Sequence, residues 1–224
     1  MKSDRTMDEI YSAFIDLIQE RPLDKVTIRS IVERCGKNRK TFYYHFVNKD
    51  RLIIWVFRKE LADHLREKYP ENNLVFEKED RVADIEDGFS CRQFPYYVHN
   101  TTGFCTLDHS AFFLTLGELL DQRHRYYVQV LSQYGPSSFK KYLLDLYIPA
   151  LRNDVRYILG NRYLKDDNID FLAYFYGTAF VNTLTQLMCD PQTTSVAAIM
   201  KAQGNLIHDS IRRELDEQRL RRKL

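Results

Sequence analysis

Basic, hydroxyl and aromatic side chains that could contact phosphates gather near the start of the chain. Between Lys25 and Thr41 there are six basic residues and one acid, Glu33. Residues 1–60 carry 13 Lys and Arg against 9 Asp and Glu, a charge of +4, while the remainder is at −2 with 20 against 22. This density is typical of surfaces that neutralise DNA phosphates, and an ordinary solvated face is the alternative interpretation.

Two short helices joined by a glycine turn would position these side chains. Thr27 stands where a helix N-cap is expected, and apolar residues recur on one helical face over 28–35. Gly36 can adopt the left-handed conformation that ends a helix, and Asn38 can cap a second helix over 39–46. This spacing predicts a helix-turn-helix, whose second helix enters the major groove of DNA.

The same residues carry a family resemblance. The segment Val26–Phe46, with its Thr-Phe-Tyr-Tyr-His-Phe core, and the following Lys-Asp-Arg-Leu at 49–52 resemble the DNA-binding signature of the TetR family. Lys37 departs from the pattern, because that family usually places a small or apolar residue there. The resemblance therefore implies a helix-turn-helix regulator, and the DNA sequence that it reads cannot be carried over from relatives.

The second helix of the motif has two distinct faces. Phe42 and Phe46 are four residues apart, so both are expected to be buried beneath the helix. The opposite face and the start of the first helix supply the candidate DNA-binding residues: Thr27, Arg29, Lys37, Asn38, Arg39, Lys40, Thr41, Tyr43, Tyr44, His45 and Lys49.

The candidate residues divide into two groups by expected role. By resemblance, four of them are expected to hold phosphates: Thr27, Tyr43, His45 and Lys49. Four others suit base recognition, since Arg bonds the guanine edge and Thr meets a thymine methyl: Arg29, Arg39, Lys40 and Thr41. Structural alternatives stay open: Tyr44 packed on a neighbouring helix, His45 bonded to a backbone carbonyl, and Arg29 paired with Glu33.

The periodicity of the whole chain predicts an all-α fold. Nearly every segment repeats its apolar residues at helical spacing, and only 8 glycines and 6 prolines interrupt them. Helices are predicted, besides the two of the motif, over 7–20, 49–69, 94–104, 110–134, 137–161, 169–189 and 195–220, with a kink at Pro149 and an acidic loop over 71–87. We expect a helix-turn-helix DNA-binding domain over 1–50 and a helical regulatory and dimerisation domain over 51–224.

The penultimate predicted helix carries an apolar stripe too broad for one buried face, and the last one repeats apolar residues at helical spacing. The family dimerises through these helices, so the predicted homodimer interface is Phe171, Phe175, Phe180, Leu184, Leu187, Ile199, Gln203, Leu206, Ile207 and Ile211. Small residues at Gly177 and Gly204 would permit close helix approach. The alternative is that both helices only complete a monomeric core.

The family often encloses an effector pocket in its helical body. The aromatic-rich residues that would build one here are Tyr96, Tyr97, Phe104, Phe112, Phe113, Leu116, Leu120, Tyr127 and Phe175. Sequence does not distinguish a pocket from a filled core, because cavities are recognised by shape.

The resemblance implies double-stranded DNA with a near-palindromic operator as partner, a homodimeric repressor, and control by a small-molecule effector. The alternatives are an activator, or a protein-interaction module controlled by a protein partner. The chain shows no signal peptide and no apolar run of membrane-spanning length, so we expect a bacterial cytoplasmic protein, nucleoid-associated when bound to DNA, with no membrane partner.

Enzymatic chemistry is not indicated. Six histidines and four cysteines are scattered, and Cys105 with His109 supplies only two ligands at helical spacing, so no metal site is predicted. The sequence has no nucleophile elbow, phosphate-binding glycine loop or dinucleotide fingerprint. We therefore expect no catalytic residue and no cofactor.

Overall fold

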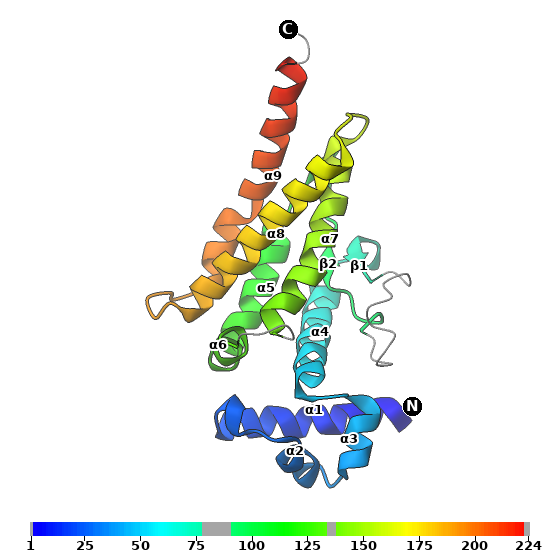
Figure 1. Ribbon diagram of the computed structural model, residues 1–224, viewed down its shortest axis with the longest axis vertical. Coiled ribbons are helices and arrows are strands. Elements are labelled where there is room, and N and C mark those ends of the chain that lie inside the picture. Colours follow the sequence, from blue (N-terminus) through cyan, green and yellow to red (C-terminus); the bar gives the residue numbers. More distant parts are fainter. Residues whose placement is uncertain (1, 78–90, 134–137, 222–224) are drawn as a thin grey trace.

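The computed structural model describes residues 2–77, 91–133 and 138–221, and within them a small helical head carries an elongated helical body (Figure 1). The head contains α1 (Lys2–Glu20), the 3-10 turn η1 (Leu23–Lys25), α2 (Ile28–Arg34) and α3 (Arg39–His45). Helix α4 (Lys49–Lys68) leaves the head and enters the body. The predicted all-α class is confirmed.

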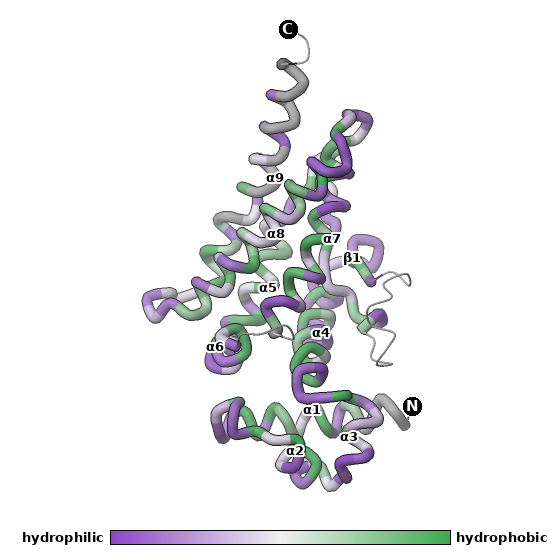
Figure 2. Tube along the Cα trace, viewed as in Figure 1, coloured by the Kyte–Doolittle hydropathy of each residue, from purple (hydrophilic) through white to green (hydrophobic). Residues whose placement is uncertain are grey.

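The body is a helical bundle that α4 enters from the head. It comprises α5 (Ser110–Gln122), α6 (His124–Leu131), α7 (Phe139–Leu159), α8 (Asp166–Cys189) and α9 (Val196–Arg221). Helix α9 packs along α5 and α8 packs along α7. Apolar and polar residues alternate along these helices (Figure 2), as expected when each buries one side.

The segment between α4 and α5 differs from the prediction. A 3-10 turn, η2 (Glu71–Asn73), precedes β1 (Leu74–Val75), which pairs antiparallel with β2 (Tyr97–Val98). A hairpin of β3 (Thr101–Gly103) and β4 (Thr106–Leu107) follows. The helix predicted over 94–104 is therefore wrong. Part of the acidic loop predicted over 71–87 lies outside the described residues.

The strands replace the helix because long-range contacts outweigh the local pattern. Tyr97 donates a hydrogen bond of 2.7 Å to the buried carboxylate of Asp154 in α7, and His109 Nε2 lies 2.9 Å from the same oxygen. Burial raises the pKa of Asp154, but the hydrogen bonds from His109 and His99 outweigh it and hold that pKa below its usual range. This buried cluster fastens the sheet segment to α7.

Arg123 divides the helix predicted over 110–134 into α5 and α6. Its backbone leaves the helical region, with φ −123° and ψ 39°, and its Nε lies 2.8 Å from a carboxylate oxygen of Glu60 in α4. The ion pair explains the break, because the buried carboxylate of Glu60 holds the half-buried guanidinium of Arg123 in place. Pro149 lies inside α7, which runs through it as one helix.

The head and body share one apolar core through α4. Trp55 of α4 contacts Phe46 at the end of the motif, with ring centroids 5.8 Å apart, and contacts Phe94 of the body at the same separation. The orientation of the head is therefore tied to the packing of α4. Among the described residues, no helix is long and apolar enough to cross a membrane.

Candidate DNA-binding site

The start of α2 is fixed by a reciprocal pair of hydrogen bonds. The Ser30 amide donates to Thr27 Oγ1 and the Thr27 amide donates to Ser30 Oγ, both at 3.1 Å. The predicted N-cap at Thr27 is confirmed. The Thr27 hydroxyl already accepts the hydrogen bond of the cap. A phosphate contact by Thr27 would therefore depend on its exposed position at the helix N-terminus.

The turn between α2 and α3 follows the prediction closely. Gly36 has φ +66°, the left-handed conformation that glycine adopts without steric cost. Asn38 Oδ1 accepts hydrogen bonds from the Thr41 amide at 2.8 Å and from Thr41 Oγ1 at 3.0 Å, which caps α3. This cap fixes the direction in which α3 presents its outer face.

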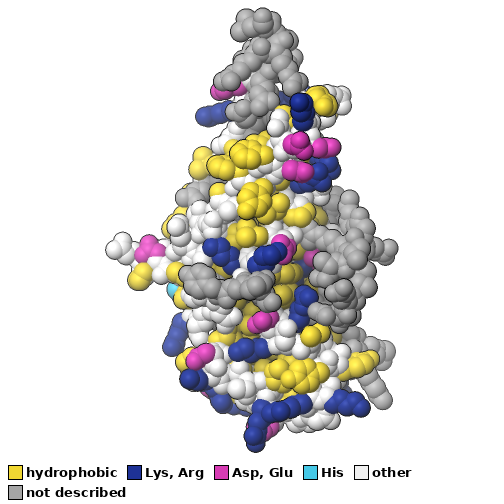
Figure 3. All heavy atoms as spheres, viewed as in Figure 1, with side chains coloured by type: hydrophobic (Ala, Val, Ile, Leu, Met, Phe, Trp, Pro, Cys, Tyr) yellow, Lys and Arg dark blue, Asp and Glu magenta, His cyan; other side chains and the backbone are white. Residues whose placement is uncertain are grey.

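Helix α3 buries one face and exposes the other. Phe42 and Phe46 are fully buried, as predicted from their spacing. On the outer face Arg39 and Lys40 are exposed, and Tyr44 is 81% exposed, so the alternative of Tyr44 packed on a neighbouring helix is wrong. Lys and Arg side chains gather at this end of the molecule (Figure 3). The exposed face is cationic, aromatic and the width of one helix, which suits a major groove.

His45 lies at the edge of this face and is partly buried. Burial lowers the pKa of its imidazole below the ordinary value, which favours the neutral ring. Its ring lies edge-on to that of Tyr44, with centroids 4.9 Å apart. Tyr43 is 53% exposed beside it. A neutral imidazole next to two phenols can donate to phosphate oxygens.

Three of the candidate cations have partners within the chain. Arg29 Nε lies 2.7 Å from Glu33, the alternative left open by the sequence, and Lys37 Nζ lies 2.6 Å from Glu9 of α1. Both pairs are solvent-accessible and contribute little, so DNA can compete for these cations. Lys49 differs from them, because its half-buried ammonium donates to two backbone carbonyls of the η1 region.

Most of the residues proposed for an effector pocket are buried in the core. Tyr96, Phe112, Phe113, Leu116, Leu120 and Tyr127 are each at most 4% exposed and pack in the continuous core, and Tyr97 packs with them. Phe175 and Phe104 are instead 55% and 87% exposed. A cleft of about 470 Å³ lies elsewhere, between the head and the body.

The predicted interface residues fall into three groups. Phe171, Phe175 and Leu206 are exposed, and Leu187 and Ile199 are partly exposed. Phe180 and Leu184 are buried within the subunit, where Phe180 packs on Phe113 with centroids 4.8 Å apart, so they are not available to a partner. The side chains of Gln203, Ile207 and Ile211 lie outside the described residues.

The small residues of α8 and α9 act within the subunit. A Cβ added at Gly177 would lie 2.7 Å from Ile148 of α7, and one at Gly204 would lie 2.6 Å from the backbone of Ser110 in α5. These glycines permit the close helix approach expected from the sequence, of α8 on α7 and of α9 on α5 within the subunit.

Sequence reasoning missed the polar junction between the head and the body. Glu60 of α4 is 7% exposed and accepts hydrogen bonds from Tyr11 of the head at 2.9 Å and from Tyr127 of α6 at 3.2 Å. Arg123 completes the junction. The available signal was the position of Glu60 one helical turn after Val56 and Phe57 in the fourth predicted helix, because a carboxylate on an apolar face needs partners.

The fold and the site define a helix-turn-helix DNA-binding protein, and comparison with known proteins identifies its family. Residues 10–55 match the family model of bacterial regulatory proteins of the TetR family, and residues 108–209 match that of a transcriptional regulator C-terminal region. The chain belongs to the TetR family. It is therefore a transcriptional regulator and not an enzyme.

Two matches involve a named member of this group. The chain is 32% identical over 62 residues to the HTH-type dhaKLM operon transcriptional activator DhaS of Lactococcus lactis subsp. lactis (strain IL1403), a match that covers 28% of this chain and only 33% of that protein. The solved structure of the dihydroxyacetone kinase operon activator DhaS is similar in fold, with TM-score 0.52 and 16% identity over 92% of this chain and 96% of the other.

Proposed function

We propose that this protein is a homodimeric transcriptional repressor that binds a near-palindromic operator and is controlled by an effector. The observation that carries the proposal is the outer face of α3, where Arg39 and Lys40 are exposed and no ion pair or hydrogen bond occupies their side chains among the described residues. Cations in this position on a rigid, capped helix are suited to base edges and phosphates.

The proposed homodimer rests on an apolar patch on α8. Phe171 and Phe175 stack with centroids 6.1 Å apart and an interplanar angle of 21°, and Tyr174 beside them is 62% exposed. Apolar side chains follow this helix across the face of the molecule shown in Figure 3. Contiguous exposed aromatics of this kind are typical of protein interfaces. Two subunits joined here would present two heads to one operator.

The proposed operator binding is tested by fluorescence anisotropy with DNA from the region upstream of the protein's own gene and with random DNA of equal length. The specific site is expected to bind at least about a thousandfold more tightly than random DNA at moderate salt. Two subunits should bind each operator. Equal affinity for both DNAs would contradict the proposal.

An activator is the second candidate function, because the relative DhaS is named as one. A reporter gene placed behind the operator separates the two, with and without the protein. A repressor lowers the reporter signal, and an activator raises it.

The dimer predicts that charge on the α8 patch separates the subunits. Phe171→Lys combined with Phe175→Lys should convert the protein to a monomer in light scattering, since two ammonium groups would be desolvated in the interface. Affinity for the full operator should fall, while circular dichroism stays unchanged. Phe104→Lys is the matched control, because Phe104 is an exposed aromatic outside α8. A dimeric double variant would contradict this interface.

A further inference from the structure

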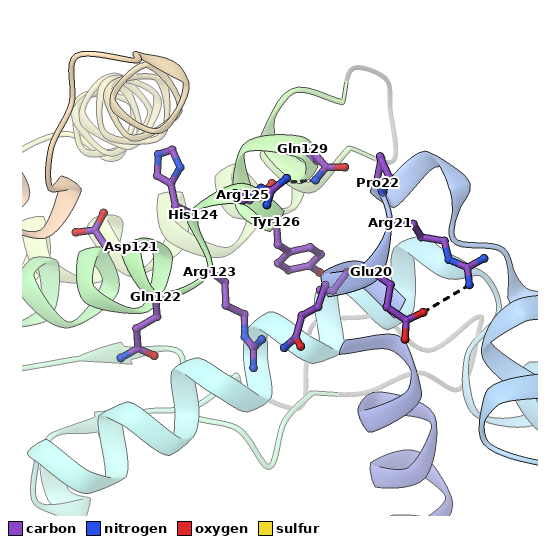
Figure 4. A pocket seen from close by; sticks show the side chains of 12 residues that line it. Glu20, Arg21, Pro22, Asp121, Gln122, Arg123, His124, Arg125, Tyr126 and Gln129 are labelled. Carbon is purple, nitrogen blue, oxygen red and sulfur yellow. Dashed lines mark hydrogen bonds and ion pairs between the residues drawn. The ribbon is translucent and has the colours of Figure 1, made fainter. Parts of the chain in front are cut away.

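A cleft separates the end of the first head helix from the corner between α5 and α6. It has a volume of about 470 Å³, within the range of small-molecule sites. One wall is residues 18–22 of the head and the other is residues 121–126 together with Gln129 of the body (Figure 4). The cleft therefore touches both the head and the body.

The two carboxylates of the cleft are already satisfied. Glu20 receives both guanidinium nitrogens of Arg34, at 2.8 and 2.7 Å. Asp121 accepts hydrogen bonds from Ser195 Oγ at 2.9 Å, from the Val196 amide at 3.0 Å and from the Ala197 amide at 3.1 Å, so it caps α9. Neither carboxylate is left to attract a cation.

Two side chains of the cleft are donors without an acceptor among the described residues, those of Tyr126 and Arg125. Tyr126 is only 5% exposed, and its hydroxyl has no hydrogen-bond partner among the described residues. Its side chain extends toward the head side of the cleft (Figure 4). Arg125 is exposed, and no described residue pairs with its guanidinium. A buried donor without an acceptor is costly, so a ligand that accepts a hydrogen bond here would be stabilising.

We propose that this cleft binds a small organic anion through its carboxylate or phosphate group, with the Arg125 guanidinium and the Tyr126 hydroxyl as donors. A planar guanidinium bonds two oxygens of such a group at once, and the phenol supplies a third donor. The site is distinct from the buried aromatic core that contains most of the predicted pocket residues.

Occupancy of the cleft should alter DNA binding, an inference that rests on the proposed function. The junction of Glu60 with Tyr11 and Tyr127 already joins the head to the body. Leu23 of the head also donates its amide to Gln129 Oε1 at 2.6 Å. An anion held by Arg125 and Tyr126 would lie against residues 18–22 of the head at this junction, and such contacts favour one head orientation over others.

Binding is tested by calorimetry with citrate and inorganic phosphate as separate probes at constant ionic strength. The wild type should bind at least one probe, and which one binds distinguishes carboxylate from phosphate recognition. Arg125→Gln and Tyr126→Phe should each weaken that binding, by about tenfold for the arginine. Arg213→Gln, an exposed site on α9, is the matched control and should leave the affinity unchanged. Absence of binding, or equal binding by all variants, would overturn the proposal.

The effect on DNA is measured separately on the same proteins. Saturation with the bound probe should change the operator affinity of the wild type at least severalfold, and should not change that of Arg125→Gln. An unchanged wild-type affinity would overturn the regulatory role. Without any anion, Arg125→Gln should bind the operator like the wild type. Failure of every variant to bind an operator would instead contradict the proposed function, independently of the calorimetry.

Discussion

Lys49 connects the head's internal turn to the first residue of α4. Its Nζ donates to the carbonyls of Leu23 at 3.0 Å and Val26 at 3.2 Å, and burial lowers the pKa of the ammonium. The geometry favours a structural role over the phosphate contact expected from the family resemblance, because two of its three donors are already used.

Lys49→Ala should therefore lower the free energy of unfolding by about 1–3 kcal/mol, since two carbonyls lose a charged donor. Chemical denaturation measures this loss. Lys40→Ala is the control: Lys40 is exposed, and its removal should change stability by less than about 0.5 kcal/mol. If Lys49→Ala were as stable as wild type and only flattened the salt dependence of DNA binding, the phosphate role would stand instead.

His45 predicts a pH dependence of operator binding. Burial lowers the pKa of the free imidazole below its ordinary value, and a nearby phosphate would raise it by favouring the charged form. The complex then binds more protons than the free protein, so affinity should rise as the pH falls from about 7.5 toward about 5.5. In His45→Gln, the part of this pH dependence of affinity that comes from His45 should vanish. The same slope in both proteins would exclude a phosphate contact by His45.

At the scale of elements, the close packing of α5 against α9 depends on a glycine. A Cβ at Gly117 would lie 2.4 Å from Cα and 2.7 Å from N of Ala197, so the two helices would have to separate. Gly117→Ala should destabilise the protein by about 1–3 kcal/mol in thermal or chemical unfolding.

Gly103→Ala in β3 is the control for this substitution, because the nearest atom would lie 4.0 Å away. If the two variants were equally stable, the contact between α5 and α9 would be looser than described.

Local signals predicted the elements of the head, and distant contacts decided what was missed. The Thr27 and Asn38 caps and the left-handed Gly36 act within three residues of their partners, so the sequence displays them. The pairing of β1 with β2 and the Arg123–Glu60 ion pair join residues far apart in the chain, so helical periodicity could not indicate them.

At the scale of the whole molecule, the head and body form a continuous structure through α4. Periodicity predicted the apolar stripes of α8 and α9 but not which of their residues face the subunit's own core. Phe180 turned out to be internal and Phe175 external, although both lie on the same helix. Periodicity could not indicate the cleft either, because its walls come from residues 18–22, 121–126 and 129 and its shape exists only in the folded chain.

The central claim is that the outer face of α3 reads DNA sequence, and Arg39 tests it most directly. The measurement is a base-by-base binding profile of the operator for wild type and Arg39→Ala, with Arg213→Gln as the control. Arg39→Ala should relax the preference at one position in each half-site by about 1–3 kcal/mol and leave the other positions unchanged. An identical profile for Arg39→Ala, or a wild type without base preference, would contradict this account.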